Sequence, residues 1–212
     1  MDKNKFYKAI FNCCGNEGIL SGVNYCIEND AYILTASDGH LLVRCFLPLD
    51  FATADLDGKT KAFNGCDVDG KFPNVKVVIP NSTPQHIYEY KIKELISICN
   101  FLLKHKNGIY GKNPPKNRLD FNGAYINVKY LKTVLNVLSL FSSDVIIEVR
   151  SNTLPLIIKI KDSETLGIIM PALKYDIDVK WDAPDAKVEY TIDETIELMD
   201  AKPIIKDKMW YE

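Results

Sequence analysis

The feature that most constrains the fold is a pattern that occurs twice along the chain. In each copy an amphipathic helix (3–14 and 128–141) is followed by two strands that a short polar turn connects. The helices also match in detail, because Lys5-Phe-Tyr-Lys8-Ala-Ile-Phe-Asn12 has the same pattern as Lys129-Tyr-Leu-Lys132-Thr-Val-Leu-Asn136. Each lysine pair therefore lies opposite an apolar stripe. The match also fits two ordinary amphipathic helices with solvated lysines. Either way, the pattern predicts an α+β fold with amphipathic helices packed on antiparallel sheets.

The remaining elements follow from periodicity and turn residues. A third helix is predicted over 91–105, and acidic residues indicate the start of a short helix at 193–197. The predicted strands are 23–27, 32–36, 41–47, 75–79, 145–149, 156–160 and 167–170. Loops are predicted at 50–70 and 107–117, and prolines at 80 and 84 indicate a boundary. We therefore expect two units, 1–80 and 81–175, followed by an acidic tail, 176–212.

Charge and cysteine usage exclude several classes of protein. The net charge is -2, but from Lys174 to Glu212 there are 6 Lys and 11 Asp or Glu, so the tail carries -5 and the rest +3. No apolar run approaches the roughly 20 residues that cross a bilayer, and the N-terminus does not resemble a signal peptide. The 6 cysteines and 3 histidines lack zinc-site spacing. We expect free thiols, a cytoplasmic protein and no membrane contact.

No catalytic motif is present in the sequence. It contains no phosphate-binding Gly-rich loop, no Gly-x-Ser-x-Gly elbow and no His-Glu-x-x-His helix. Asp38 and His40 could form a dyad, but a tight turn in which Asp38 bonds its own backbone is the better interpretation. Asp176, Asp178 and Asp182 are interpreted as a solvated strand edge rather than as metal ligands. The sequence therefore predicts no catalytic residues, no metal and no cofactor.

Four motifs in order carry a resemblance to a known family. The first is Gly18-Ile-Leu-Ser-Gly-Val-Asn-Tyr-Cys-Ile-Glu28, and the second is Tyr32-Ile-Leu-Thr-Ala-Ser-Asp-Gly-His-Leu-Leu-Val43. The third is Asp69-Gly-Lys-Phe-Pro-Asn-Val-Lys-Val-Val-Ile-Pro80. The fourth combines Ile126-Asn-Val-Lys-Tyr-Leu131 with Leu154-Pro-Leu-Ile-Ile158 and Ile168-Ile-Met-Pro-Ala-Leu173. Over about residues 3–175 the chain resembles the middle and last domains of the bacterial DNA polymerase III beta subunit, the DNA sliding clamp. It departs from that family in three places: the stretch between His40 and Phe72 lacks a helix, the stretch before Asn127 is short, and nothing corresponds to the first domain.

The resemblance implies a DNA-clamp-like fold of two shortened units. It implies a non-catalytic processivity factor or scaffold in DNA replication, which binds short peptides of DNA polymerase and repair proteins. An apolar cleft would accept the Leu and Phe anchors of such a peptide. By matching motifs, the peptide-binding pocket comprises Leu20, Ser37, Gly39, His40, Leu42, Pro73, Val78, Asn127, Tyr130, Leu154, Met170 and Pro171. Double-stranded DNA would be contacted without sequence specificity by Lys5, Lys8, Lys129 and Lys132.

Three functions stay open at the level of sequence. The first is a sliding-clamp-type scaffold, and two-domain chains of this kind would need to form a homotrimer to close a ring. The second is a clamp-fold module that forms no ring and recruits or sequesters replication proteins. The third is an unrelated α+β enzyme. Oligomeric state, DNA encirclement and partner identity are not encoded in any motif of this sequence.

Overall fold

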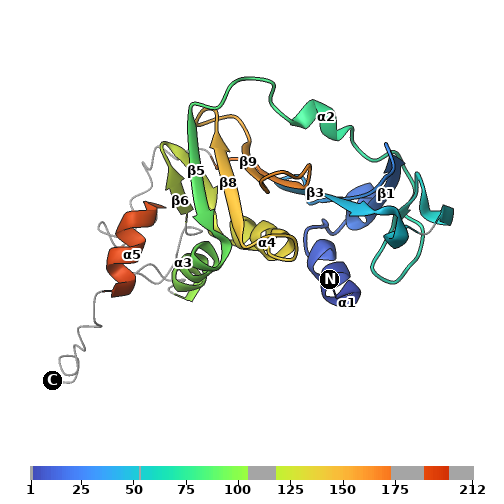
Figure 1. The fold of residues 1–212 in the computed structure, drawn as a ribbon, viewed down its shortest axis with the longest axis horizontal. Helices are drawn as coiled ribbons and strands as arrows, with labels where there is room; N and C mark the ends of the chain where they lie inside the picture. The colour runs from blue at the N-terminus through green and yellow to red at the C-terminus, as the bar shows by residue number, and fades with distance from the viewer. Residues whose placement is uncertain (1, 53, 105–117, 173–188, 201–212) are drawn as a thin grey trace.

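An eight-stranded antiparallel sheet runs through the molecule (Figure 1). In the computed structural model, which describes residues 2–52, 54–104, 118–172 and 189–200, the strand order is β4-β1-β2-β3-β10-β9-β8-β5. The strands are β1 (Val23–Glu28), β2 (Ala31–Ser37), β3 (Leu41–Pro48), β4 (Thr60–Lys61), β5 (His86–Lys91), β8 (Asp144–Val149), β9 (Leu156–Lys159) and β10 (Leu166–Ile169). The predicted strands near 23–27, 32–36, 41–47, 145–149, 156–160 and 167–170 are confirmed.

Three helices pack on one face of this sheet and enclose the main core (Figure 1). They are α1 (Lys3–Phe11), α3 (Ile92–Lys104) and α4 (Val128–Leu138). All three were predicted, although α1 and α4 end three residues before the predicted ends. The Asp2 carboxylate caps α1 by accepting from the backbone N–H of Asn4 at 2.9 Å, and Asn127 caps α4 by accepting from Lys129 N–H at 2.9 Å. The predicted apolar stripes are buried beneath the sheet, except that Ala9 and Ile96 are half-buried at the edge of the core.

The strand hairpins form where the sequence supplies residues that tolerate a positive φ. Asn29 and Asp30 have φ of 49° and 58° between the paired residues Glu28 and Ala31. Two consecutive positive φ values are typical of the two-residue turn that matches the twist of a hairpin. The predicted polar turn after β1 is therefore confirmed.

The large sheet is continuous across the predicted unit boundary at residue 80. Strand β3 pairs with β10, with Leu41 opposite Ile169 and Arg44 opposite Leu166. Strands from 23–61 form one half of the sheet and strands from 86–169 the other. The division into two units remains a prediction, but the strands of both are hydrogen-bonded into one sheet.

The prediction of a strand at 75–79 is wrong, because this segment forms the short helix α2 (Val75–Val78). Asn74 caps this helix by accepting from Lys76 N–H at 3.1 Å. A strand needs a free edge, and both sides of β3 are already occupied by β2 and β10. The segment instead lies across the sheet on the face opposite α1 and α4 (Figure 1). Between His40 and Phe72 the described residues form β3, β4 and two short 3-10 turns, with no α-helix.

A second, three-stranded sheet and a last helix complete the described part of the chain. The sheet has the order β11-β6-β7, formed by β11 (Glu189–Tyr190), β6 (Arg118–Phe121) and β7 (Ala124–Asn127). Helix α5 (Ile192–Asp200) confirms the predicted helix at 193–197. The predicted loop at 107–117 and the acidic residues Asp176, Asp178 and Asp182 lie outside the described residues. No helix in the described ranges has the length and apolar composition needed to cross a membrane.

Candidate functional site

The turn between β2 and β3 is held by its own side chains. The Asp38 carboxylate accepts from the backbone N–H groups of His40 and Leu41, both at 2.8 Å. The Ser37 hydroxyl donates to Leu41 O at 2.7 Å and accepts from Gly39 N–H at 3.1 Å. Gly39 has a φ of 88°, which favours glycine. The turn interpretation of Asp38 is therefore confirmed, since its carboxylate binds the backbone of the turn.

This turn brings together residues that are far apart in the sequence. The backbone N–H of Met170 donates to His40 O at 2.8 Å, so the end of β10 lies against the turn. The His40 ring stacks on Tyr130 of α4, with 5.6 Å between ring centroids and 16° between planes. Burial raises the pKa of Tyr130, and the charge of Asp38 adds to that effect. His40, Tyr130 and Met170 thus form one junction between the two halves of the chain.

Leu20 lies beside the same turn, within a 3-10 turn of its own (Gly18–Ser21). The backbone N–H of Gly15 donates both to Leu20 O at 2.8 Å and to Ser37 O at 3.1 Å. A Cβ placed on Gly39 would lie 4.0 Å from Leu20 Cδ1. The predicted neighbours Leu20, Ser37 and Gly39 are therefore adjacent in space.

Leu42 belongs to a small apolar cluster on the outer face of the sheet, which is the face opposite α1 and α4. Leu42 and Ile168 are buried beside Val75 of α2, and Phe72 and Ile79 pack against them. Ile168 and Val75 were not among the predicted site residues. Ile168 could have been found from the sequence, because it precedes Met170 by two positions on the same strand face.

Several predicted pocket residues expose apolar side chains. Among the large hydrophobic residues that are exposed in the described chain, three were predicted as pocket residues: Val78 (36%), Leu154 (38%) and Met170 (40%). Leu154 and Met170 lie at one end of the sheet, just before β9 begins and just after β10 ends. Asn127 and Pro171 are half-buried, and the Asn127 side-chain oxygen is already used to cap α4. We call the surface formed by His40, Leu42, Val78, Tyr130, Leu154 and Met170 the junction surface.

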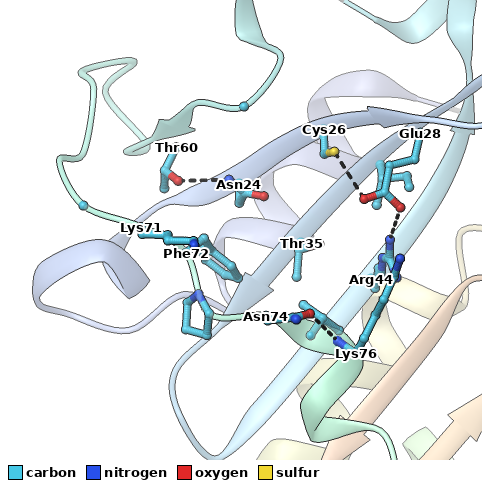
Figure 2. Close-up of a pocket in the computed structure, with 15 residues that line it drawn as sticks. Asn24, Cys26, Glu28, Thr35, Arg44, Thr60, Lys71, Phe72, Asn74 and Lys76 are labelled. Carbon is cyan, nitrogen blue, oxygen red and sulfur yellow. Dashed lines mark hydrogen bonds and ion pairs between the residues drawn. The ribbon is translucent and has the colours of Figure 1, made fainter.

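Pro73, another predicted pocket residue, lies in the wall of a cavity of about 370 Å³. Figure 2 shows this cavity between the segment 70–76 and the outer face of strands β1, β2 and β3. The Asn24 side-chain N–H donates to the Thr60 hydroxyl at 3.2 Å, and Arg44 pairs with Glu28 at 3.1 Å. Phe72 and Val75 line the cavity and also belong to the cluster around Leu42. Segment 70–76 therefore belongs both to the cavity wall and to the apolar cluster around Leu42.

The cavity is lined by a thiol, an ion pair and two lysines. Burial raises the pKa of the Cys26 thiol, and the charges of Glu28 and Asp57 raise it further, so the thiol is protonated rather than nucleophilic. Arg44 is neutralised by Glu28, whereas Lys71 and Lys76 form no ion pair with any described residue. In the described ranges no three metal-binding side chains cluster together.

The predicted DNA-facing lysines lie on neighbouring helices. Lys5 and Lys8 are exposed on α1, Lys129 is exposed on α4 and Lys132 is half-buried there. The two helices are joined through the core, where Phe6 meets Phe141 edge-to-face with 5.8 Å between ring centroids. The lysines thus lie on the helical layer, while segment 70–76 lies on the opposite face of the sheet (Figure 1).

Comparison with solved structures shows a consistent likeness to bacterial sliding clamps. The chain is 17% identical to the DNA polymerase sliding clamp of Bacillus subtilis, with a TM-score of 0.58 over 81% of this chain and 62% of the clamp. It is 17% identical to the DNA polymerase III beta subunit of Thermotoga maritima, with a TM-score of 0.55 over 80% and 63%. It is 15% identical to the sliding clamp of Pseudomonas aeruginosa bound to griselimycin, with a TM-score of 0.57 over 79% and 63%.

These values establish the fold. The chain has the fold of the bacterial DNA polymerase III beta sliding clamp, as the resemblance implied, and it spans about 62% to 63% of the length of those three clamps. No protein-family model matches the sequence, and no curated protein matches it.

Proposed function

We propose that the protein is a non-catalytic, clamp-fold scaffold of DNA replication that binds short peptides of DNA polymerase and repair proteins at the junction surface. The observation that carries the proposal is the contact of His40, Tyr130 and Met170, which three separate segments bring together. Val78, Leu154 and Met170 expose apolar side chains and Leu42 is buried, and an apolar surface suits the Leu and Phe anchors of an extended peptide. Met170 has an unbranched, adaptable side chain that fits different anchors.

A direct binding measurement tests the proposal. The probes are griselimycin, which is bound in the Pseudomonas aeruginosa clamp, and a synthetic peptide that ends in Leu-Phe. Both should bind the full chain and compete with each other in calorimetry. Met170→Asp places a charge among apolar anchors and should weaken binding of both at least tenfold, or about 1.4 kcal/mol.

A matched control separates this effect from a general loss of structure. Ile87 on β5 is also an exposed apolar residue (60%), but it lies outside the junction surface. Ile87→Asp should leave the affinity for both probes unchanged. Failure of both probes to bind the wild-type chain, or equal binding by the Met170→Asp variant, would contradict the proposal.

DNA contact is a second part of the same proposal. Lysines on α1 and α4 extend from the helical layer, and cations on exposed helices bind phosphates without reading the sequence. A ring that encircles DNA requires this chain to associate with further copies, as a homotrimer of two-unit chains. A module that forms no ring needs only the junction surface.

A further inference from the structure

The outer face of strands β1, β2 and β3 carries a row of polar side chains beneath segment 70–76. The strand register places Asn24 opposite Thr35 and Thr35 opposite Arg44, so these three side chains lie on the same face of the sheet. Leu34, the neighbour of Thr35 along β2, belongs to the main core on the other face. The polar row therefore forms the floor of the cavity of about 370 Å³ (Figure 2).

The side chain of Thr35 is a buried polar group that lines this cavity. Thr35 is only 4% exposed, and its hydroxyl forms no hydrogen bond with any described residue. Its neighbours on the floor are already engaged, since the Asn24 amide donates to Thr60 and Arg44 pairs with Glu28. Buried polar groups in folded proteins nearly always have a partner. The Thr35 hydroxyl is therefore available to bind a ligand inside the cavity.

The charges of the lining favour an anion. Among the described residues that line the cavity, Arg44, Lys71 and Lys76 are the cations, and Glu28 is the carboxylate that opposes them. The Arg44 side chain is only 13% exposed and is matched by Glu28, whereas Lys71 and Lys76 are exposed and form no ion pair within the described ranges. The unmatched positive charge thus lies at the mouth of the cavity, where a lysine can bind a phosphate group.

The wall formed by segment 70–76 supplies an aromatic ring. Phe72 is half-buried, lines the cavity and points from this segment toward the strands (Figure 2). Ile33, which lies on the same face of β2 as Thr35, adds an apolar surface to the floor. Aromatic side chains stack on any nucleobase, because every base has a π-face. The cavity volume of about 370 Å³ is near the lower end of the range for small-molecule sites, so it suits one small molecule.

We propose that this cavity binds a nucleoside monophosphate. The phosphate pairs with Lys71 and Lys76 at the mouth, the base stacks on Phe72, and a polar group of the nucleoside bonds the Thr35 hydroxyl. A simple anion would use only the lysines, and a sugar phosphate would leave the aromatic wall without a partner. None of the six residues of the junction surface lines the cavity, so the inference does not depend on peptide binding there.

Calorimetry on the full chain tests the inference, with deoxyadenosine monophosphate (dAMP) as the probe. Deoxyadenosine, which lacks the phosphate, should bind about tenfold more weakly than dAMP. Inorganic phosphate and deoxyribose phosphate, which lack the base, should also bind about tenfold more weakly. Absence of dAMP binding at millimolar concentration would overturn the inference. Equal affinities for inorganic phosphate and dAMP would overturn it too, because they would indicate a surface that attracts any anion.

Two variants connect binding to the cavity. Thr35→Val keeps the shape of the side chain and removes a hydroxyl that has no partner among the described residues, so the fold should be retained. It should weaken dAMP binding about fivefold, as expected for one lost hydrogen bond. The combined variant Lys71→Gln, Lys76→Gln should weaken dAMP binding about tenfold and remove the advantage of dAMP over deoxyadenosine.

A matched control replaces two exposed lysines that do not line the cavity. Lys93→Gln together with Lys161→Gln should leave the affinity for dAMP unchanged. Thr35→Val should bind the peptide that ends in Leu-Phe as the wild type does, so a failure of peptide binding and a failure of dAMP binding are distinguishable. Unchanged dAMP affinity in Thr35→Val and in the Lys71, Lys76 variant, both with native circular dichroism, would show that the inference is wrong.

Discussion

Glu148 is a buried side chain of β8 whose ion pairs connect this strand to β9 and, through Arg150, to the segment before β5. It is hydrogen-bonded to Arg150 at 2.8 Å and to Lys159 at 2.6 Å, and Arg150 in turn donates to Ser82 O at 2.7 Å. The Arg150 and Glu148 side chains are only 6% and 12% exposed. Such a pair is costly to break from one side, because the remaining charge stays buried without its partner.

Glu148→Gln should therefore lower the free energy of unfolding by about 3 kcal/mol, measured by urea denaturation. As a control, Asp144→Asn removes the partner of Lys91 in an exposed ion pair and should change stability little. Equal effects of the two substitutions would contradict the structural assignment.

The same residue predicts a pH dependence. Burial alone raises the pKa of Glu148, but hydrogen bonds from Lys159 and Arg150 outweigh burial and hold the pKa below its ordinary value. A carboxyl whose pKa is lowered by folding stabilises the protein above its unfolded pKa. This stability is lost as the pH falls through the folded pKa. Thermal melts should therefore show a smaller loss of stability on acidification for Glu148→Gln than for the wild type.

At the scale of elements, the close approach of α4 to β10 depends on Gly167. A Cβ built on Gly167 would lie 2.2 Å from Val134 Cγ1. Val134 is β-branched and lies in a helix, where its side chain is restricted to one main rotamer. The helix therefore packs on the sheet at a distance that only glycine permits at this position.

Gly167→Ala should destabilise the protein by about 1–3 kcal/mol through overpacking, measured by urea denaturation. Val134→Ala removes the clashing methyl groups and leaves a cavity. The double variant should cost less than the sum of the two single variants, because each substitution relieves the defect of the other. Additive costs would show that the two residues are not in contact.

Strands β5, β6, β7 and β11 were missed in the sequence, and only the hairpin of β6 and β7 carried a clear local signal. Asn122 and Gly123, with φ of 53° and 88°, connect β6 to β7 in the way typical of a two-residue hairpin. Strand β5 was missed because it is an edge strand whose residues are mostly exposed, so apolar alternation is weak. Strand β11 has two residues and depends wholly on the β6 edge that it pairs with.

At the scale of the whole molecule, the two faces differ in what they offer to a partner. The helical layer carries Lys5, Lys8, Lys129 and Lys132, and the opposite face carries Lys71 and Lys76 around the cavity. Only the first group belongs to the proposed DNA surface. The second group therefore provides a control of like charge on the other face.

Replacement of the four helical lysines by Gln should weaken binding to double-stranded DNA and reduce its salt dependence. The slope of log affinity against log salt should fall by about 0.9 for each phosphate contact that is lost. Replacement of Lys71 and Lys76 by Gln should leave this slope unchanged. Anisotropy titrations at several salt concentrations measure both, and equal loss in the two variants would place DNA binding elsewhere.

The sequence by itself determined the elements whose periodicity and caps are local. It predicted α1, α3 and α4, the hairpin at Asn29–Asp30 and the turn at Asp38, because these depend on residues a few positions apart. The tertiary structure alone decided the rest. Whether the apolar segment at 75–79 became strand or helix depended on β10 occupying the edge of β3. The stacking of His40 on Tyr130 and the pairing of β11 with β6 depend on segments that are distant in the chain, and local pattern carries no information about which segments meet.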